Sequence, residues 1–167
     1  MDTRYSHDRG FTLIELVITI TLIGILLALA APGFRQLTLN QGVKTAAFDL
    51  VSALQYARSE AIKRPSEAVT LKSGAASDGA WSTGWRLLDG AGDNLRSWTV
   101  ASNITVTDKN GTPLTQITFG KDGHLAATMA ATPKIEVKSS TTTSGVGPRC
   151  IKVDLVGRPT ATMAACS

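Results

Sequence analysis

The longest pattern in the sequence is a largely apolar run over residues 11–31, in which Glu15 is the single charged residue. At a rise of about 1.5 Å per residue, a helix over this run is roughly 31 Å long, which matches a hydrocarbon core of about 30 Å. The run therefore predicts a membrane-spanning helix. A carboxylate at the bilayer centre costs roughly 2.5 to 3.5 kcal/mol, so we expect Glu15 to have a partner.

A short polar leader, residues 1–10, precedes the apolar run. It carries Arg4 and Arg9, which favours a cytoplasmic position for it. A secretory signal peptide is the main alternative, with the alanines near residue 30 as a loose cleavage site. The length of the run and the charge inside it disfavour that alternative.

A second helical pattern follows, with apolar residues at three- and four-residue steps. Pro65 disfavours helical geometry at the preceding residue, so we expect the helix to end near Lys63. Pro32 and Gly33 fall between the two patterns, which predicts one long helix that is kinked or locally melted there. The residues of the apolar stripe are Val43, Ala47, Leu50, Val51, Leu54, Ala57 and Ala61.

Beyond Pro65 the pattern changes to short β-branched and aromatic runs separated by turn residues, which is typical of antiparallel strands. Asn110-Gly111 and Asp122-Gly123 are the strongest hairpin signals, because both dipeptides tolerate positive φ. Two Ser- and Gly-rich stretches, 73–80 and 139–147, predict loops. The expected strands are 68–72, 84–88, 95–100, 104–107, 116–119, 134–138 and 150–156.

Composition adds few chemical constraints. From Gly33 onward the chain carries 15 Lys and Arg against 10 Asp and Glu, a mildly basic balance that a solvated surface explains and that a nucleic-acid partner would also fit. Cysteines and histidines lack the paired spacing of a metal site, and His124 is expected on a hairpin. No nucleophile, phosphate-loop or zinc-protease motif is present, so we expect neither an enzyme nor a cofactor.

The residues Gly10-Phe11-Thr12-Leu13-Ile14-Glu15-Leu16 resemble the processing site of type IV prepilins and type II secretion pseudopilins. The resemblance implies cleavage between Gly10 and Phe11 by a prepilin peptidase and N-methylation of Phe11. It also implies that Glu15 pairs with the amino terminus of a neighbouring subunit. The pairing would account for the buried carboxylate, because removing one partner of such a pair typically costs about 3 to 5 kcal/mol.

A second resemblance covers most of the chain. Residues 54–64, Ile117-Thr118-Phe119 with Gly123, and Val156-Gly157-Arg158 are similar to GspH/FimT-type minor pilins. This implies a pilin-like α+β fold, a long helix with a transmembrane half and an amphipathic half packed on an antiparallel β-sheet head. The expected parts are a leader, 1–10, a filament-core helix, 11–32, and a periplasmic head, 33–167, with helix over about 35–63 and strands over about 67–167.

The function that this resemblance implies is that of a minor pilin in a type IV pilus, in the priming or tip complex. The expected partners are other major and minor pilins, the prepilin peptidase and the inner-membrane assembly platform. The protein would be a single-pass inner-membrane protein with a periplasmic head, and later part of the filament. A minor pseudopilin of type II secretion and a DNA-binding minor pilin for transformation are the two alternatives.

Cys150 and Cys166 are expected to form a disulfide in an oxidising periplasm, which would stabilise the chain by on the order of 3 kcal/mol. Terminal disulfides are common in pilus subunits of this class, so the pair favours the pilus over the secretion alternative.

Five cations near the C terminus are the candidates for DNA binding. The pattern of DNA-binding members is Gly-Arg-x-Arg, but here Thr160 stands where the second arginine is expected, which removes one phosphate contact. A solvated strand edge guarded by lysines is the simpler interpretation. The five candidates are Lys134, Lys138, Arg149, Lys152 and Arg158.

Overall fold

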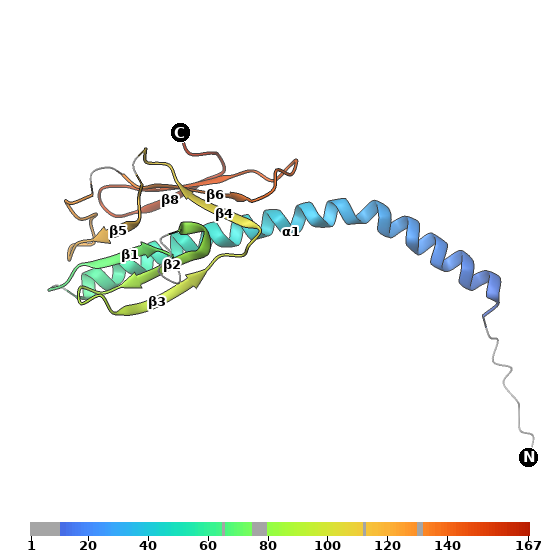
Figure 1. The fold of residues 1–167 in the computed structure, drawn as a ribbon, viewed down its shortest axis with the longest axis horizontal. Helices are drawn as coiled ribbons and strands as arrows, with labels where there is room; N and C mark the ends of the chain where they lie inside the picture. The colour runs from blue at the N-terminus through green and yellow to red at the C-terminus, as the bar shows by residue number, and fades with distance from the viewer. Residues whose placement is uncertain (1–10, 65, 75–79, 112, 130–131) are drawn as a thin grey trace, which may run out of the picture. The chain divides into compact units, whose positions relative to one another are not determined.

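The computed structural model describes residues 11–64, 66–74, 80–111, 113–129 and 132–167 of the 167-residue chain. Gly10 and Pro65 lie outside the described residues. The contacts divide the chain into two compact units, Met1–Arg35 and Gln36–Ser167. One helix, α1, runs over Leu13–Lys63 and contributes residues to both units (Figure 1). Its end at Lys63 is the one that the sequence predicts.

The helix continues through Pro32 and Gly33, which confirms the one long helix that the sequence predicts; in the separate chain it is not melted at this point. Proline removes one backbone donor, and the hydrogen bonds on either side of it hold the helical geometry. An added Cβ at Gly33 would meet no atom within 4 Å, so nothing packed nearby forces the backbone open.

The described part of the first unit, residues 11–35, is largely an apolar helix, and all of these residues are exposed. It contains one stretch that is long and apolar enough to cross a membrane, and none of that stretch is buried inside the structure. The large hydrophobic side chains from Phe11 to Leu29 are each between 47% and 88% exposed.

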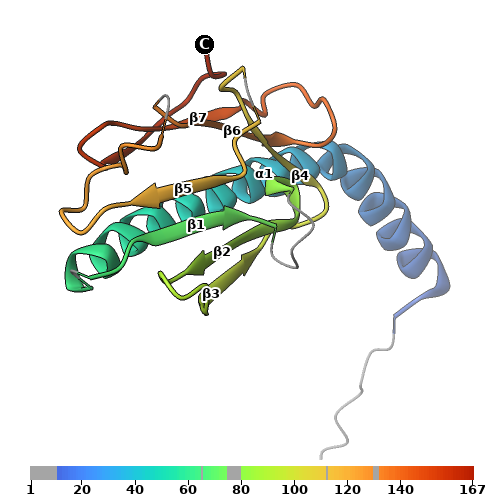
Figure 2. The same ribbon diagram turned by 60° about the vertical axis from the view of Figure 1, so that its left-hand side comes forward.

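The second unit combines the C-terminal half of α1 with two antiparallel four-stranded sheets (Figures 1 and 2). The first sheet has the order β3-β2-β1-β5, and the second has the order β4-β6-β7-β8. A short 3-10 helix, η1 (Trp81–Thr83), precedes β2. The strands are β1 (Val69–Ser73), β2 (Gly84–Leu88), β3 (Asn94–Thr99), β4 (Ile104–Asp108), β5 (Gln116–Phe119), β6 (Lys134–Ser139), β7 (Arg149–Val153) and β8 (Pro159–Thr162).

One hydrophobic core lies between α1 and the two sheets. Six of the seven helical residues predicted to pack are buried, and Val51 is half-buried. Leu39, Ala46 and Ala53 join them, because the inner faces of two sheets cover a wider stripe of helix than the sequence pattern indicated. Trp81 and Trp85 are also in the core.

Two strand-level expectations are wrong. Asn110-Gly111 lies in a bend and joins no hairpin, because β4 pairs with β6 and β5 pairs with β1. The Asn110 side chain binds both backbone groups of Lys134, at 3.1 Å and 2.9 Å, where the chain leaves one sheet for the other. The predicted strand 150–156 ends at Val153, and the chain then turns back into β8.

The Ser- and Gly-rich loop before β7 is held against the helix. Gln36 donates from Nε2 to the carbonyl oxygen of Ser144 at 2.7 Å, and Asn40 donates from Nδ2 to that of Gly145 at 2.9 Å. Two amides one helical turn apart thus hold this loop beside the start of the second unit.

Candidate functional site

The start of α1 is organised around Thr12 and Glu15. The Thr12 backbone amide and hydroxyl both donate to Oε2 of Glu15 at 3.0 Å, and the Glu15 amide donates to the Thr12 hydroxyl at 3.2 Å. The first helical hydrogen bond, from the amide of Leu16 to the carbonyl of Thr12, makes Thr12 the N-cap. This arrangement is a capping box, and its Thr-x-x-Glu spacing is visible in the sequence.

The second carboxylate oxygen of Glu15, Oε1, makes no hydrogen bond to any residue that the structure describes. Glu15 is exposed, as is Phe11, four residues before it in the sequence. The capping box therefore fixes one oxygen within the chain and leaves the other directed to solvent, lipid or another protein. The structure does not describe Gly10, the residue before the predicted cleavage point.

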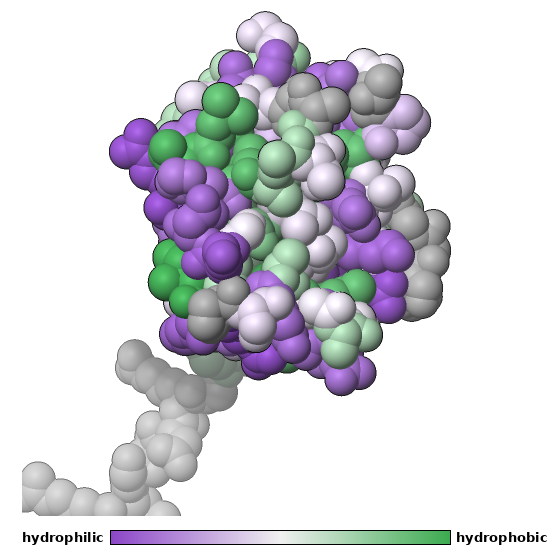
Figure 3. Space-filling model, turned by 90° about the vertical axis from the view of Figure 1, so that its left-hand side faces the viewer, coloured by the Kyte–Doolittle hydropathy of each residue, from purple (hydrophilic) through white to green (hydrophobic). Residues whose placement is uncertain are grey.

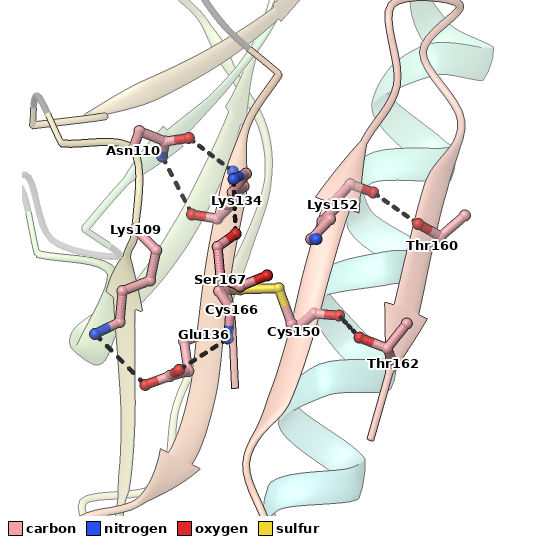
Figure 4. The surroundings of a disulfide bond; sticks show 10 residues. All are labelled: Lys109, Asn110, Lys134, Glu136, Cys150, Lys152, Thr160, Thr162, Cys166 and Ser167. Carbon is pink, nitrogen blue, oxygen red and sulfur yellow. Dashed lines mark hydrogen bonds and ion pairs between the residues drawn. A yellow bond between two sulfur atoms is a disulfide. The ribbon is translucent and has the colours of Figure 1, made fainter. Parts of the chain in front are cut away.

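In the second unit, a disulfide joins Cys150 of β7 to Cys166, with 5.0 Å between the Cα atoms. The expected disulfide is thereby confirmed. It holds the C-terminal tail across the outer face of the second sheet (Figure 4). There the Lys134 ammonium donates to the carbonyl oxygen of Ser167 at 2.7 Å.

Glu136 anchors the same tail, a role that the sequence did not indicate. It lies opposite Cys150 in the β6–β7 register and is only 5% exposed. Its Oε2 accepts the Cys166 backbone amide at 3.1 Å, and its Oε1 lies 3.7 Å from the Lys109 ammonium (Figure 4). The same Oε1 lies 3.9 Å from the Lys138 ammonium. This carboxylate thus neutralises part of the basic charge around it.

The five cations proposed for DNA binding do not form one surface. Lys134, Lys138 and Lys152 alternate with the core residues of β6 and β7 and lie on the outer face of the second sheet. Arg149 pairs with the buried Val137 and lies on the opposite face, toward α1.

Arg158, the fifth cation, lies in the turn between β7 and β8. Its Nε is 3.1 Å from the Asp154 carboxylate, and its backbone amide donates to the same carboxylate at 2.7 Å. The backbone hydrogen bond is the main cause that lowers the pKa of Asp154 below its ordinary value. Because Arg158 and Lys138 are each paired with a carboxylate and Arg149 lies on the far face, the continuous basic track that phosphates need is absent from this set.

The two glycine-containing motifs of the sequence lie against each other. An added Cβ at Gly157 would overlap the carbonyl oxygen of Gly123 and would lie 3.3 Å from the Phe119 ring. Both glycines have positive φ, +78° and +73°, and Arg58 of α1 donates from Nε to the same carbonyl at 3.1 Å. This packing places the β7–β8 turn against the turn after β5 and the helix.

The surface at the end of the head where α1 terminates is mixed (Figure 3). Described apolar residues form small patches there, separated by hydrophilic ones. Among the described residues, no cluster of His, Cys, Asp and Glu has the arrangement of a metal site. His124 lies 3.3 Å from Asp122 in the turn after β5.

A long N-terminal helix with an apolar, membrane-length first half and antiparallel sheets packed on its second half is the architecture of the type IV pilin class. Residues 46–157 match the family described as type II transport protein GspH, and residues 5–31 match the prokaryotic N-terminal methylation motif. The chain belongs to the GspH family. Its methylation motif, GspH region and fold are those of a type IV minor pilin, a structural and non-catalytic class whose members assemble with other pilins in filaments.

Relatives agree with this assignment. Two fimbrial proteins of Pseudomonas aeruginosa are 40% and 39% identical over 123 residues, which are 71% of this chain and 73% of each relative. The crystal structure of the P. aeruginosa PAO1 type IV minor pilin FimU has a similar fold, with a TM-score of 0.60 and 23% identity. That match covers 75% of this chain and 92% of FimU.

Proposed function

We propose that this minor pilin is cut between Gly10 and Phe11, methylated on Phe11, and inserted into a type IV pilus through its N-terminal helix. Residues 11–32 anchor it in the inner membrane before assembly, and residues 33–167 form a periplasmic head. The prepilin peptidase and the inner-membrane assembly platform act on it in turn. The match of residues 5–31 to the methylation motif is the main support for the processing step.

The main support for the assembly step is the carboxylate of Glu15, because only one of its two oxygens has a hydrogen-bond partner among the described residues. Its Oε2 is held by Thr12, while Oε1 has no hydrogen bond to a described residue. A charged acceptor in an apolar setting is stable only when it is paired and hydrogen-bonded. The α-ammonium of a neighbouring subunit, which is left behind by cleavage after the leader, supplies a donor of opposite charge.

The exposed apolar side chains of the helix supply the rest of the driving force. In the membrane they contact lipid, and in the filament they contact the equivalent helices of other subunits. The helix can open at Pro32 and Gly33 on assembly. Proline lacks a backbone donor, which removes one helical hydrogen bond, and glycine has no side chain to restrict its backbone conformation. In the separate chain this point is helical.

A type IV pilus is favoured over a type II secretion filament by the fimbrial relatives and by the C-terminal disulfide. The test is a deletion strain scored for pilus-dependent motility, exoprotein export and transformation in parallel. Loss of motility with normal export supports the pilus, and the reverse result contradicts it. Mass spectrometry of the purified protein tests processing, because a mature chain that starts at methyl-Phe11 is expected and a start after residue 31 contradicts the proposal.

A further inference from the structure

A groove of about 300 Å³ lies between α1 and the edge strand β8 of the second sheet. On the helix, Lys44, Phe48 and Val51 line it from one face, at three- and four-residue steps. On the sheet, Arg149 at the start of β7 and Met163 just after β8 close the other side. All of these residues belong to the second unit.

The two cations of this groove have no partner within the part of the chain that the structure describes. Nε of Arg149 is buried and makes no hydrogen bond, and Lys44 takes part in no ion pair there. None of the described residues that line the groove is acidic. A buried donor without an acceptor costs free energy, so an acceptor from another molecule would be bound preferentially here.

The apolar side chains of the groove are equally uncovered. Phe48 is 71% exposed and Met163 is 82% exposed, the largest values for big hydrophobic residues in the second unit. Large exposed apolar residues beside a groove are typical of a protein interaction surface. The groove therefore combines a hydrophobic surface with an unpaired guanidinium and an unpaired ammonium.

We propose that this groove binds the head of a neighbouring pilin subunit through a segment that carries a carboxylate next to a large apolar side chain. A guanidinium binds a carboxylate through two parallel hydrogen bonds, and the apolar neighbour covers Phe48 and Met163. Nucleic acid fits less well, because two cations on an apolar surface provide too few phosphate contacts, and the lysines of the second sheet lie on its other face. The inference rests on the proposed assembly into a filament.

The test is site-specific photo-crosslinking of the full-length chain in cells that assemble filaments. Phe48 is replaced by the photo-reactive p-benzoylphenylalanine, and the adduct is mapped by tandem mass spectrometry. The expected adduct is a peptide of another pilin with Asp or Glu beside a large apolar residue. The same probe at Ser97 of β3, an exposed residue of the other sheet, is expected to give no such peptide.

Charge reversal tests the role of the two cations. Lys44→Glu and Arg149→Glu are each expected to lower the crosslinking yield at least about tenfold, because they turn attraction into repulsion. Lys121→Glu, on an exposed lysine outside the groove, is the matched control and is expected to leave the yield unchanged. Formation of the disulfide, read on a non-reducing gel, confirms folding. If Arg149→Glu does not fold, the crosslinking yield of Lys44→Glu, a change at an exposed residue, serves as the test.

An adduct with phospholipid or DNA, no pilin adduct, or a yield that is insensitive to Lys44→Glu overturns the inference. The filament content of the same cells separates this result from a failure of the proposed function. If the wild-type protein is present in filaments but gives no groove adduct, the proposed role of the groove is contradicted and the proposed assembly is not. Wild-type protein absent from filaments contradicts the proposed assembly itself.

Discussion

Thr12 and Glu15 bind each other from both directions: two Thr12 donors meet one Glu15 oxygen at 3.0 Å, and the Glu15 amide returns a bond to the Thr12 hydroxyl at 3.2 Å. The pair satisfies backbone donors that would otherwise face lipid at the start of the helix. It also restricts the Glu15 side chain to one orientation. The residue that we propose to join subunits is thus oriented by its own chain.

Replacing Glu15 by Gln tests the charge separately from the shape. The amide keeps an oxygen for Thr12 but loses the negative charge that an α-ammonium needs. We expect normal cleavage after Gly10 and a content in purified filaments at least about tenfold lower, the effect of losing a charge pair. Immunoblots of membranes and filaments measure both quantities, and an unchanged filament content contradicts the role of Glu15.

Thr12 is expected to act through Glu15. Thr12→Ser keeps the hydroxyl and should assemble like the wild type, whereas Thr12→Val keeps the shape and removes two of the three hydrogen bonds. We expect Thr12→Val to lower the filament content, and to have little further effect when Glu15 is already Gln. Equal filament content for the Ser and Val variants would contradict the positioning role.

Removing the disulfide should loosen the C-terminal tail. Because the cysteines are 16 positions apart in the sequence, the chain-entropy model gives a loss of about 3 kcal/mol in the free energy of unfolding for the double Cys150→Ala, Cys166→Ala variant. Denaturant unfolding of the full chain in detergent, followed by tryptophan fluorescence, measures the loss. A reducing agent should lower the stability of the wild type by a similar amount and leave the double variant unchanged.

Gly157 and Gly92 form a matched pair for a test of packing. Both have positive φ, +78° and +91°, but an added Cβ at Gly92 meets nothing within 4 Å, whereas at Gly157 it overlaps Gly123. Gly92→Ala is expected to cost about 1 kcal/mol of unfolding free energy from backbone strain. Gly157→Ala should cost about 1 to 3 kcal/mol more from overpacking. Equal losses in denaturant titrations would contradict the close contact.

Asp154 predicts a pH dependence of stability. Its pKa is lowered in the folded chain, chiefly by the Arg158 backbone amide, so it stabilises the fold above its unfolded value of about 3.9. That contribution is lost as the pH falls through the lower, folded pKa. The stability difference between the wild type and Asp154→Asn should therefore be constant above about pH 5 and shrink below about pH 4.

Arg158→Ala is the control for this prediction, because it removes the guanidinium and keeps the backbone amide. It should retain most of the pH dependence that Asp154→Asn abolishes. Thermal unfolding of each variant between pH 2.5 and pH 7 measures the effect. A difference between the wild type and Asp154→Asn that does not change over this range contradicts the assignment.

Local patterns along the chain were enough to predict the extent of α1, the strands β2 and β5, and the apolar run that needs lipid or protein around it. The helical period, the proline after Lys63 and the alternating β-branched residues are each visible within a few residues of the sequence. The residues that form these patterns are also the ones that stabilise the local element, so the pattern is a reliable guide to it. The processing motif and the capping box are equally local. Asn110-Gly111 shows the limit, because a turn signal predicts a turn but not which strand pairs afterwards.

Only the folded head decides which distant residues become neighbours. It separates Arg149 from the lysines of the same two strands, places Gly157 against Gly123, and holds the Ser144 loop with two amides of α1. Each of these contacts depends on which sheet a strand joins and which face turns inward. That choice minimises the free energy of the whole core. The core is built from many segments of the chain, so no single segment of the sequence determines the choice.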